Sequence, residues 1–249
     1  MAQGPTYRVK FRRRREGKTN YYRRRRLLLS KQPRLVIRKT NTKIIVQVMT
    51  AKIPGDVTEA SAISSELLKH GWGAATNNLP SAYLTGLLAG LRAKSRGVDY
   101  AVLDIGLNPP VKGSKIYAAM KGVVDAGIDV PHSPDILPDE DRLSGKHIIA
   151  SYEYHSDKEG NMFSKVGAKK TNITSIPKTF TAVKQALLDI PKAELKKKRT
   201  TKPKKSATKK PAQEKKEKPA QHPPRAIPRK PRPKKLIARR SGKKGRRNK

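Results

Sequence analysis

The residues with the clearest chemical potential lie near the start of the chain, where four consecutive arginines, Arg12 to Arg15, stand among aromatic residues. The rings belong to Tyr7, Phe11, Tyr21 and Tyr22. A guanidinium group binds a phosphate through two parallel hydrogen bonds, and an aromatic ring stacks on an unpaired base. Folded RNA offers phosphates and unstacked bases together, which plain duplex DNA does not. The combination of charges and rings therefore predicts an RNA-binding segment.

The same segment has a simpler interpretation, a solubilising or nuclear-localisation-like run whose aromatic rings pack on the rest of the protein. RNA binding explains the composition better, because arginine presents a planar fork that fits phosphate, whereas solubility requires no particular cation. These residue types alone do not identify which RNA is bound.

Positive charge is concentrated at the two ends of the chain, which carries a formal net charge of +39 over 249 residues. Residues 1–30 contain 11 Lys or Arg and one acid, and residues 191–249 contain 26 basic and three acidic residues. The segment between them is nearly balanced, with 21 basic and 15 acidic residues. We therefore expect a basic arm over 1–33, a folded domain over 34–190 and a disordered tail over 191–249, with both ends ordered only on a polyanion.

Composition excludes several classes of function. The chain has no cysteine, so it offers no disulfide framework, thiolate zinc site or thiol nucleophile. No apolar run approaches the roughly 20 residues of a membrane-spanning helix, and no signal peptide is recognisable before the arm. We expect a cytoplasmic protein without a cofactor, whose partner is nucleic acid rather than a membrane or a small-molecule substrate.

The central segment is expected to fold as a small mixed sheet packed with helices, an α/β layer flanked by the extended arm and the tail. Runs of β-branched residues indicate strands, and helical spacing with capping residues indicates helices. In chain order, the expected elements are a hinge at 30–34, an antiparallel hairpin of strands 35–37 and 44–48, a strand at 57–63 running into a short helix, a helix from Pro80, a short buried strand at 100–105, a helix from 114 to 127 and a helix at about 179–190.

A second candidate binding site is the loop that leads into the helix expected from Ser114. Lys112 and Lys115 flank this residue, and the free backbone N–H groups of a helix N-terminus attract anions. The glycine spacing does not match that of a Walker loop. An ordinary capped helix with solvated lysines explains the same residues, so both interpretations stay open.

Arrangements typical of catalysis are missing from the sequence pattern. The five histidines show no metal-ligand spacing, and the acidic run at 139–141 is typical of a solvated turn. Asp104, at the end of an expected strand, is a candidate acid for a nuclease, but a two-metal site needs acids on neighbouring strands as well. The hairpin offers Lys39 and Lys43 instead. We therefore predict no enzymatic activity and no metal site.

The tail, residues 191–249, is rich in Lys, Ala and Pro and resembles the tails of linker histones. Counterion release alone allows such a segment to bind any nucleic acid. The leading alternative function is therefore an architectural protein that binds DNA or another polyanion through this tail.

Four blocks of sequence, in order along the chain, are similar to one ribosomal family. They are Gly4 to Tyr22, which contains YRVKFRRRREGKTNYY, then Pro80 to Gly90, Leu103 to Gly127 and Val130 to Pro134. The family is the large-subunit ribosomal protein that carries 5S ribosomal RNA, universal family eighteen, in its archaeal and eukaryotic branch. The resemblance covers about residues 1–155 and does not reach the tail.

The resemblance implies a non-enzymatic constituent of the large ribosomal subunit that binds 5S rRNA and helps attach it to large-subunit rRNA at the central protuberance. It also implies contact with the family-five large-subunit ribosomal protein. The family's motifs place RNA contacts on the arm, at Arg8, Lys10, Phe11, Arg12, Arg13, Arg14, Arg15, Lys18, Asn20, Tyr21, Tyr22 and Arg23. Second-tier candidates are Lys112, Ser114, Lys115, His132 and Ser133.

Overall fold

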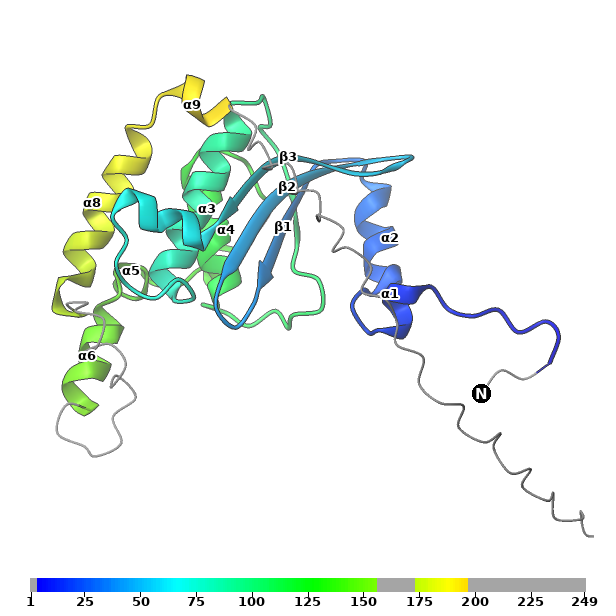
Figure 1. Ribbon diagram of the computed structural model, residues 1–249, viewed down its shortest axis with the longest axis horizontal. Helices are drawn as coiled ribbons and strands as arrows, with labels where there is room; N and C mark the ends of the chain where they lie inside the picture. The colour runs from blue at the N-terminus through cyan, green and yellow to red at the C-terminus, as the bar shows by residue number, and fades with distance from the viewer. Residues whose placement is uncertain (1–3, 156–172, 197–249) are drawn as a thin grey trace, which may run out of the picture. The chain divides into compact units, whose positions relative to one another are not determined.

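The computed structural model of the protein describes residues 4–155 and 173–196 (Figure 1). Within these residues the chain forms a mixed sheet with helices packed against it, which confirms the predicted α/β class. The disorder predicted for the tail is wrong for residues 192–196, which form a helix with Leu195 in the core, and residues 197–249 lie outside the described ranges.

The sheet has four strands in the order β3-β2-β1-β4. The antiparallel pairs are β1 with β2 and β2 with β3, whereas β4 pairs in parallel with β1. The predicted hairpin and third strand are therefore confirmed, and the hairpin turn is closed by hydrogen bonds between Thr40 and Lys43. The strands are β1 (Arg34–Lys39), β2 (Ile44–Lys52), β3 (Gly55–Ile63) and β4 (Val102–Asp104).

The buried strand expected at 100–105 is shorter than predicted, since only Val102–Asp104 pair as β4. An isolated parallel bridge between Tyr100 and Asp129 continues the pairing on the N-terminal side. On the other side Gly106 adopts a φ of +65°, which turns the chain out of the sheet. Because β4 lies at the edge of the sheet, Val102 and Leu103 are only half-buried.

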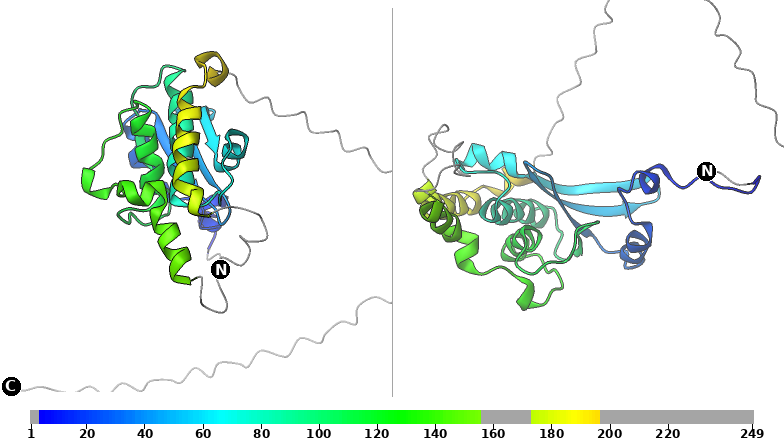
Figure 2. Two further views of the ribbon diagram at one scale, coloured as in Figure 1. Left: turned by 90° about the vertical axis from the view of Figure 1, so that its left-hand side faces the viewer. Right: turned by 90° about the horizontal axis from the view of Figure 1, so that it is seen from below.

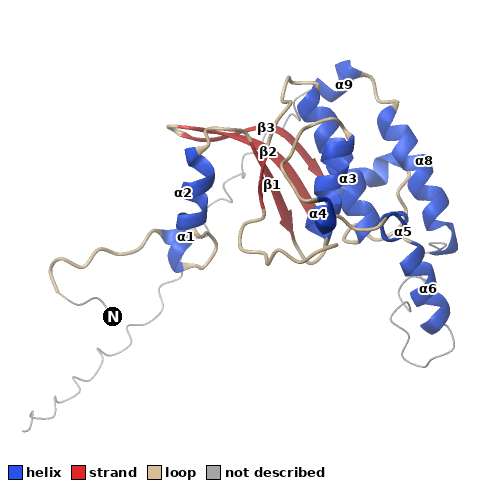
Figure 3. Ribbon diagram, turned by 180° about the vertical axis from the view of Figure 1, so that it is seen from behind, coloured by secondary structure: helices blue, strands red, loops and turns tan. Residues whose placement is uncertain are grey.

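Two helices cover one face of the sheet, α3 (Leu79–Lys94) and α4 (Lys115–Asp125) (Figures 1 and 3). The side chain of Asn78 accepts a hydrogen bond from the Ser81 backbone, forming the predicted cap of α3. Almost every residue of α3 is buried, because the sheet lies on one side of it and other helices on the rest. The backbones of α3 and α4 approach closely where Gly86 faces Ala119, since a Cβ on Gly86 would meet the Ala119 carbonyl.

The apolar core lies between the sheet and these helices. Alternate residues of β1 and β2 point into it, and all are almost fully buried: Leu35, Ile37, Ile44, Val46 and Val48. This alternation follows from the two-residue period of a strand. The predicted final helix, α8 (Ile176–Leu188), buries Phe180, Val183 and Leu187 against the same core, and Leu195 of α9 (Lys192–Lys196) also belongs to it.

Shorter helices complete this layer (Figure 2). The acidic run predicted as a solvated turn begins α5, where Asp139 occupies the N-cap position and remains exposed. The element bounds are η1 (Ser64–His70), η2 (Pro134–Ile136), α5 (Glu140–Ser144), α6 (Lys146–His155) and η3 (Ile173–Ser175).

The segment expected to be an extended arm carries two helices, α1 (Arg12–Arg15) and α2 (Tyr21–Leu29). Asn20 caps α2, because its side-chain oxygen accepts hydrogen bonds from the backbones of Tyr22 and Arg23. Neither helix contains a buried residue. The sequence signal for α2 was therefore a local cap rather than an apolar face.

Candidate nucleic-acid interface

The arginine run of the arm forms α1, and all four of its residues, Arg12–Arg15, are exposed. Glu16, the single acid nearby, lies 3.7 Å from Arg12 and 2.9 Å from Lys18. Arg13 donates a hydrogen bond of 2.8 Å from Nε to the Thr19 hydroxyl. One carboxylate beside so many cations leaves a strong positive field at the protein surface.

The aromatic residues of the arm are mostly exposed as well. Phe11 is 75% and Tyr22 is 70% accessible, and Tyr7 is also exposed. The Phe11 ring lies 5.6 Å from the half-buried Tyr21 ring, and the Arg14 guanidinium lies 5.4 Å from the centre of the Tyr22 ring. The rings therefore pack on one another and on arginine rather than in the domain core, which leaves their faces near the cations that would bind phosphate.

Next to the arm lies the sheet face that α3 and α4 do not cover. Here β1 presents Arg34, Val36 and Arg38, the residues that alternate with its core positions. The arm and this face enclose a cleft of about 920 Å³. Its basic lining residues are Arg13, Lys18, Arg23, Arg24, Arg26, Arg34 and Arg38, and its acidic ones are Asp56 and Asp104.

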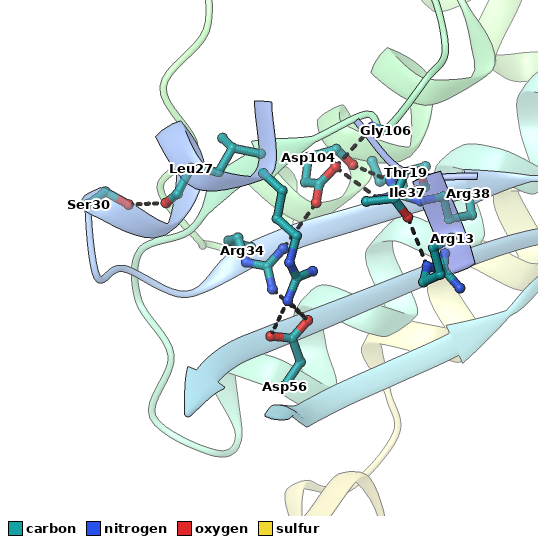
Figure 4. Close-up of polar contacts among 11 residues, drawn as sticks. Arg13, Thr19, Leu27, Ser30, Arg34, Ile37, Arg38, Asp56, Asp104 and Gly106 are labelled. Atoms are coloured by element: carbon teal, nitrogen blue, oxygen red, sulfur yellow. Dashed lines mark hydrogen bonds and ion pairs between the residues drawn. The ribbon is translucent and has the colours of Figure 1, made fainter. Parts of the chain in front are cut away.

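Asp104 neutralises two of these arginines at the edge of the sheet (Figure 4). Its carboxylate lies 3.2 Å from Arg34 Nη1 and 2.9 Å from Arg38 Nη2, and it accepts a hydrogen bond of 2.9 Å from the Gly106 backbone. Arg38 also donates to the Asp104 backbone oxygen at 2.7 Å. The acid considered for a nuclease is thus fully engaged in holding β1, β4 and the following loop together.

Asp56 joins the same group of charges to the arm. Its carboxylate accepts two hydrogen bonds from Arg24 Nη2 of α2, at 2.9 and 2.8 Å, and lies 2.8 Å from Arg34 Nη2. Burial raises the pKa of Asp56, but the hydrogen bonds and charges of Arg24 and Arg34 outweigh that effect, so its pKa lies below the ordinary value. The carboxylate is therefore ionised at neutral pH.

In the second-tier loop the three candidate residues have different surroundings. Lys115 donates from Nζ to the Asn77 backbone oxygen at 2.8 Å, and its pKa is lowered by burial and by the nearby charge of Lys39. Ser114 occupies the N-cap position of α4 without a side-chain cap bond, and its buried Oγ has no hydrogen-bond partner among the described residues. Lys112 is exposed. Of the two lysines, Lys112 is the one whose ammonium group makes no hydrogen bond to another described residue.

The two second-tier segments lie side by side. The backbone N–H of Gly113 donates to the Ile136 carbonyl at 3.0 Å, which brings the Lys112 loop against the turn that follows Ser133. His132 Nδ1 lies 2.6 Å from the Val130 carbonyl oxygen, and Ser133 is exposed. These residues form a surface separate from the arm cleft, because none of them lines it.

The sequence interpretation placed Arg13, Lys18, Asn20, Tyr21 and Arg23 in the binding segment, and the structure brings them together along the cleft. The other arm candidates, Arg8, Lys10, Phe11, Arg12, Arg14, Arg15 and Tyr22, lie outside its lining and are exposed. The cleft also contains residues that the prediction missed, namely Arg24, Arg26, Arg34 and Arg38. The spacing of Arg34 and Arg38, which places both on one face of β1, was the available signal.

Within residues 4–155 and 173–196, no group of three or more His, Asp or Glu could hold a metal ion. In the same ranges, no helix has the length and apolar character needed to cross a bilayer.

Known proteins are similar to this chain over about two thirds to three quarters of its length. Residues 5–98 and 92–133 match the family model described as ribosomal large subunit proteins 60S L5 and 50S L18. Large ribosomal subunit protein uL18 of Korarchaeum cryptofilum is 58% identical over 162 residues, which is 65% of this chain and 83% of the relative. The uL18 proteins of Haloarcula marismortui and Staphylothermus marinus are 49% and 47% identical, covering 76% of this chain and 97% and 96% of their own lengths.

The chain therefore belongs to the uL18 family of large ribosomal subunit proteins. Membership makes it a structural, non-enzymatic constituent of the cytoplasmic large subunit, where its partners are ribosomal RNA and other ribosomal proteins. The alignments to these three relatives leave 24 to 35% of the chain unmatched.

Proposed function

We propose that this protein binds 5S rRNA and helps attach it to large-subunit rRNA at the central protuberance, beside the family-five ribosomal protein. The observation that carries the proposal is the arm, whose exposed cations and exposed rings lie in one short segment next to an ordered sheet. The division of labour is an RNA-binding arm over 1–33, a stiff platform over 34–190 and a polyanion-binding tail over 191–249.

The arm supports two kinds of contact. Exposed guanidinium groups bind phosphates at little cost, because the described polar contacts of Arg12 and Arg13 within the arm are a 3.7 Å approach to Glu16 and one hydrogen bond to the Thr19 hydroxyl. Phe11 and Tyr22 offer ring faces on which unpaired bases stack. The proposed contacts are Arg8, Lys10, Phe11, Arg12, Arg13, Arg14, Arg15, Lys18, Asn20, Tyr21, Tyr22 and Arg23, with Lys112, Ser114, Lys115, His132 and Ser133 as a second group.

Replacement of Arg12–Arg15 with alanine tests the arm. We expect a sharp loss of affinity for 5S rRNA, with the thermal unfolding of the domain unchanged, because α1 contains no buried residue. The matched control removes four exposed lysines from the helical side, Lys69, Lys94, Lys178 and Lys192. The control should lose far less affinity although it loses the same charge.

The salt dependence of binding measures how many phosphates are engaged. Each neutralised phosphate contributes a slope of about −0.7 to −0.9 to log affinity against log salt, so six contacts give about −4 to −5. The quadruple arginine variant should have a clearly shallower slope than the wild type. A complex insensitive to salt would contradict the proposal.

Charge on residues 191–249, 26 basic against three acidic, supports a second candidate function, architectural binding of duplex DNA. The two candidates are separated by deleting residues 200–249, a cut that removes no described residue and keeps Leu195 in the core. Recognition of 5S rRNA should survive the deletion, whereas duplex binding driven by the tail should disappear.

A further inference from the structure

The arm helix α2 is attached to the sheet by charge rather than by apolar burial. It contains no buried residue, although Leu27 lines the cleft. A helix of nine residues is marginal in water without tertiary contacts, and its four consecutive arginines repel one another. The described hydrogen bonds from α2 to the sheet are the two that Arg24 donates to Asp56.

Asp56 is itself fixed by a buried arginine. Arg34 is 1% exposed, with one Nη atom 2.8 Å from Asp56 and the other 3.2 Å from Asp104 (Figure 4). Its Nε has no hydrogen-bond partner among the described residues. A cation in that setting depends on its two carboxylates, so Asp56 and Asp104 hold it from opposite sides. Three arginines and two aspartates thus form one chain of contacts from α2 to the loop after β4: Arg24, Asp56, Arg34, Asp104 and Arg38.

We infer that Asp56 is a positioning residue for RNA binding, and this inference rests on the proposed function. An aspartate cannot bind phosphate, and its charge opposes the approach of RNA. Its contribution is to hold α2 on the sheet through Arg24, so that the cations and rings of the arm are presented in one orientation before RNA arrives. Positioning of this kind raises affinity by reducing the ordering cost on binding.

The sign of one substitution distinguishes positioning from simple electrostatics. Asp56→Asn removes a negative charge beside the cleft, so electrostatics alone predicts tighter RNA binding. A positioning role predicts weaker binding, because the apparent affinity is proportional to the fraction of molecules in which α2 is correctly placed. If that fraction drops to between a third and a tenth, affinity for 5S rRNA should fall about three- to tenfold.

A matched control lies on the same strand. Glu59→Gln removes the same charge from β3 at a position outside the cleft lining. It should leave the affinity equal to or slightly above that of the wild type. The salt slope should be the same in all three proteins, because the set of phosphates bound does not change.

A second readout does not require RNA. In the free protein, backbone amides of Tyr21–Leu29 should exchange with deuterium faster in Asp56→Asn than in the wild type, whereas amides of α3 should be unchanged. Arg24→Lys provides an independent variant if Asp56→Asn does not fold. It keeps the positive charge but removes Nη2, the single atom that donates to both oxygens of the Asp56 carboxylate, and it should weaken RNA binding in the same direction.

The outcomes test the positioning role of Asp56 and the proposed function separately. Unchanged exchange of α2 in Asp56→Asn, or RNA affinity equal to or above the Glu59→Gln control, overturns the positioning role. Wild-type protein that binds 5S rRNA weakly and without salt dependence overturns the proposed function, and the exchange measurement then still decides whether Asp56 holds α2. Faster exchange together with weaker binding supports both.

Discussion

The two faces of the sheet are built from alternate residues of the same strands, yet they are stabilised by opposite means. On one face Leu35 and Ile37 pack against helices in an apolar core. On the other, their neighbours Arg34 and Arg38 are held by Asp104 and the adjoining Asp56. The apolar face needs no partner outside the domain. The ionic face connects the domain to a segment that carries a large excess of positive charge, so the sheet serves as the junction between a stable core and a binding arm.

The largest effect should come from breaking the ionic face at its centre. Asp104→Ala leaves the buried Arg34 with one of its two carboxylates and removes the bonds that hold Arg38, so the free energy of unfolding should fall by about 3 kcal/mol or more. Chemical denaturation measures this directly. Arg34→Met combined with Asp104→Leu should recover most of the loss, since it removes the buried charge together with its partner. A loss below about 1 kcal/mol in the single variant would contradict the importance of the pair.

Replacing a valine with alanine on each face of the sheet compares the two faces with the same change of side chain. Val46→Ala in the core should cost about 2 kcal/mol, because it removes buried methyl groups and leaves a cavity between sheet and helices. Val36→Ala should cost about half as much, since Val36 already lines a cleft and its removal enlarges an existing space. In a protein that lacks residues 1–30, the cost of Val46→Ala should be unchanged. Equal costs at the two positions would show that the arm packs as tightly as the core.

Acid should affect the two sides in different pH ranges. Asp56 has a pKa below its ordinary value of 3.8, so its contribution to stability is present above that value and is lost as the pH falls through the lower folded pKa. In the helical layer, burial and then the charge of Arg142 lower the pKa of His147 below 6.5, so its contribution is complete above pH 6.5 and declines as the pH falls through the folded value. Unfolding measured against pH should lose the lower transition in Asp56→Asn and the upper one in His147→Gln.

The smallest effect is expected at an exposed ion pair. Lys146 and Asp141 are 2.7 Å apart but remain 64% and 73% exposed, so water and salt screen their attraction. Lys146→Ala should therefore produce no measurable change in the midpoint of denaturation. The result gives the baseline against which the buried pair at Asp104 is judged.

Local patterns were sufficient for most of the core. The β-branched runs predicted the hairpin, and the leucine spacing after Pro80 predicted α3, because in these segments the periodicity of burial agrees with the local propensity. The helix α6 was not anticipated. Its apolar residues Ile148, Ile149 and Tyr152 are only partly buried against the core, so its apolar stripe is too short to stand out in the sequence.

The arm cleft could not be derived because its contacts are distant in sequence. Arg34 was assigned to a hinge, which considered only neighbouring residues, and Asp56 was given no contact. The contact between Arg24 and Asp56 spans 32 positions, and that between Arg34 and Asp104 spans 70. An arginine in a strand is usually exposed, so no local pattern indicated that Arg34 is almost completely buried.

The separation of Arg34 from Asp104 also determines the order in which the charges meet during translation. A nascent chain grows at about 5–20 residues per second, so the countercharge at Asp104 follows Arg34 after roughly 4 to 14 seconds. Asp56 is made earlier, but still after every cation of the arm. Until Asp56 and then Asp104 have been made, Arg24, Arg34 and Arg38 lack the carboxylates that later restrain them. The arm is therefore complete before either aspartate of the ionic face has been made.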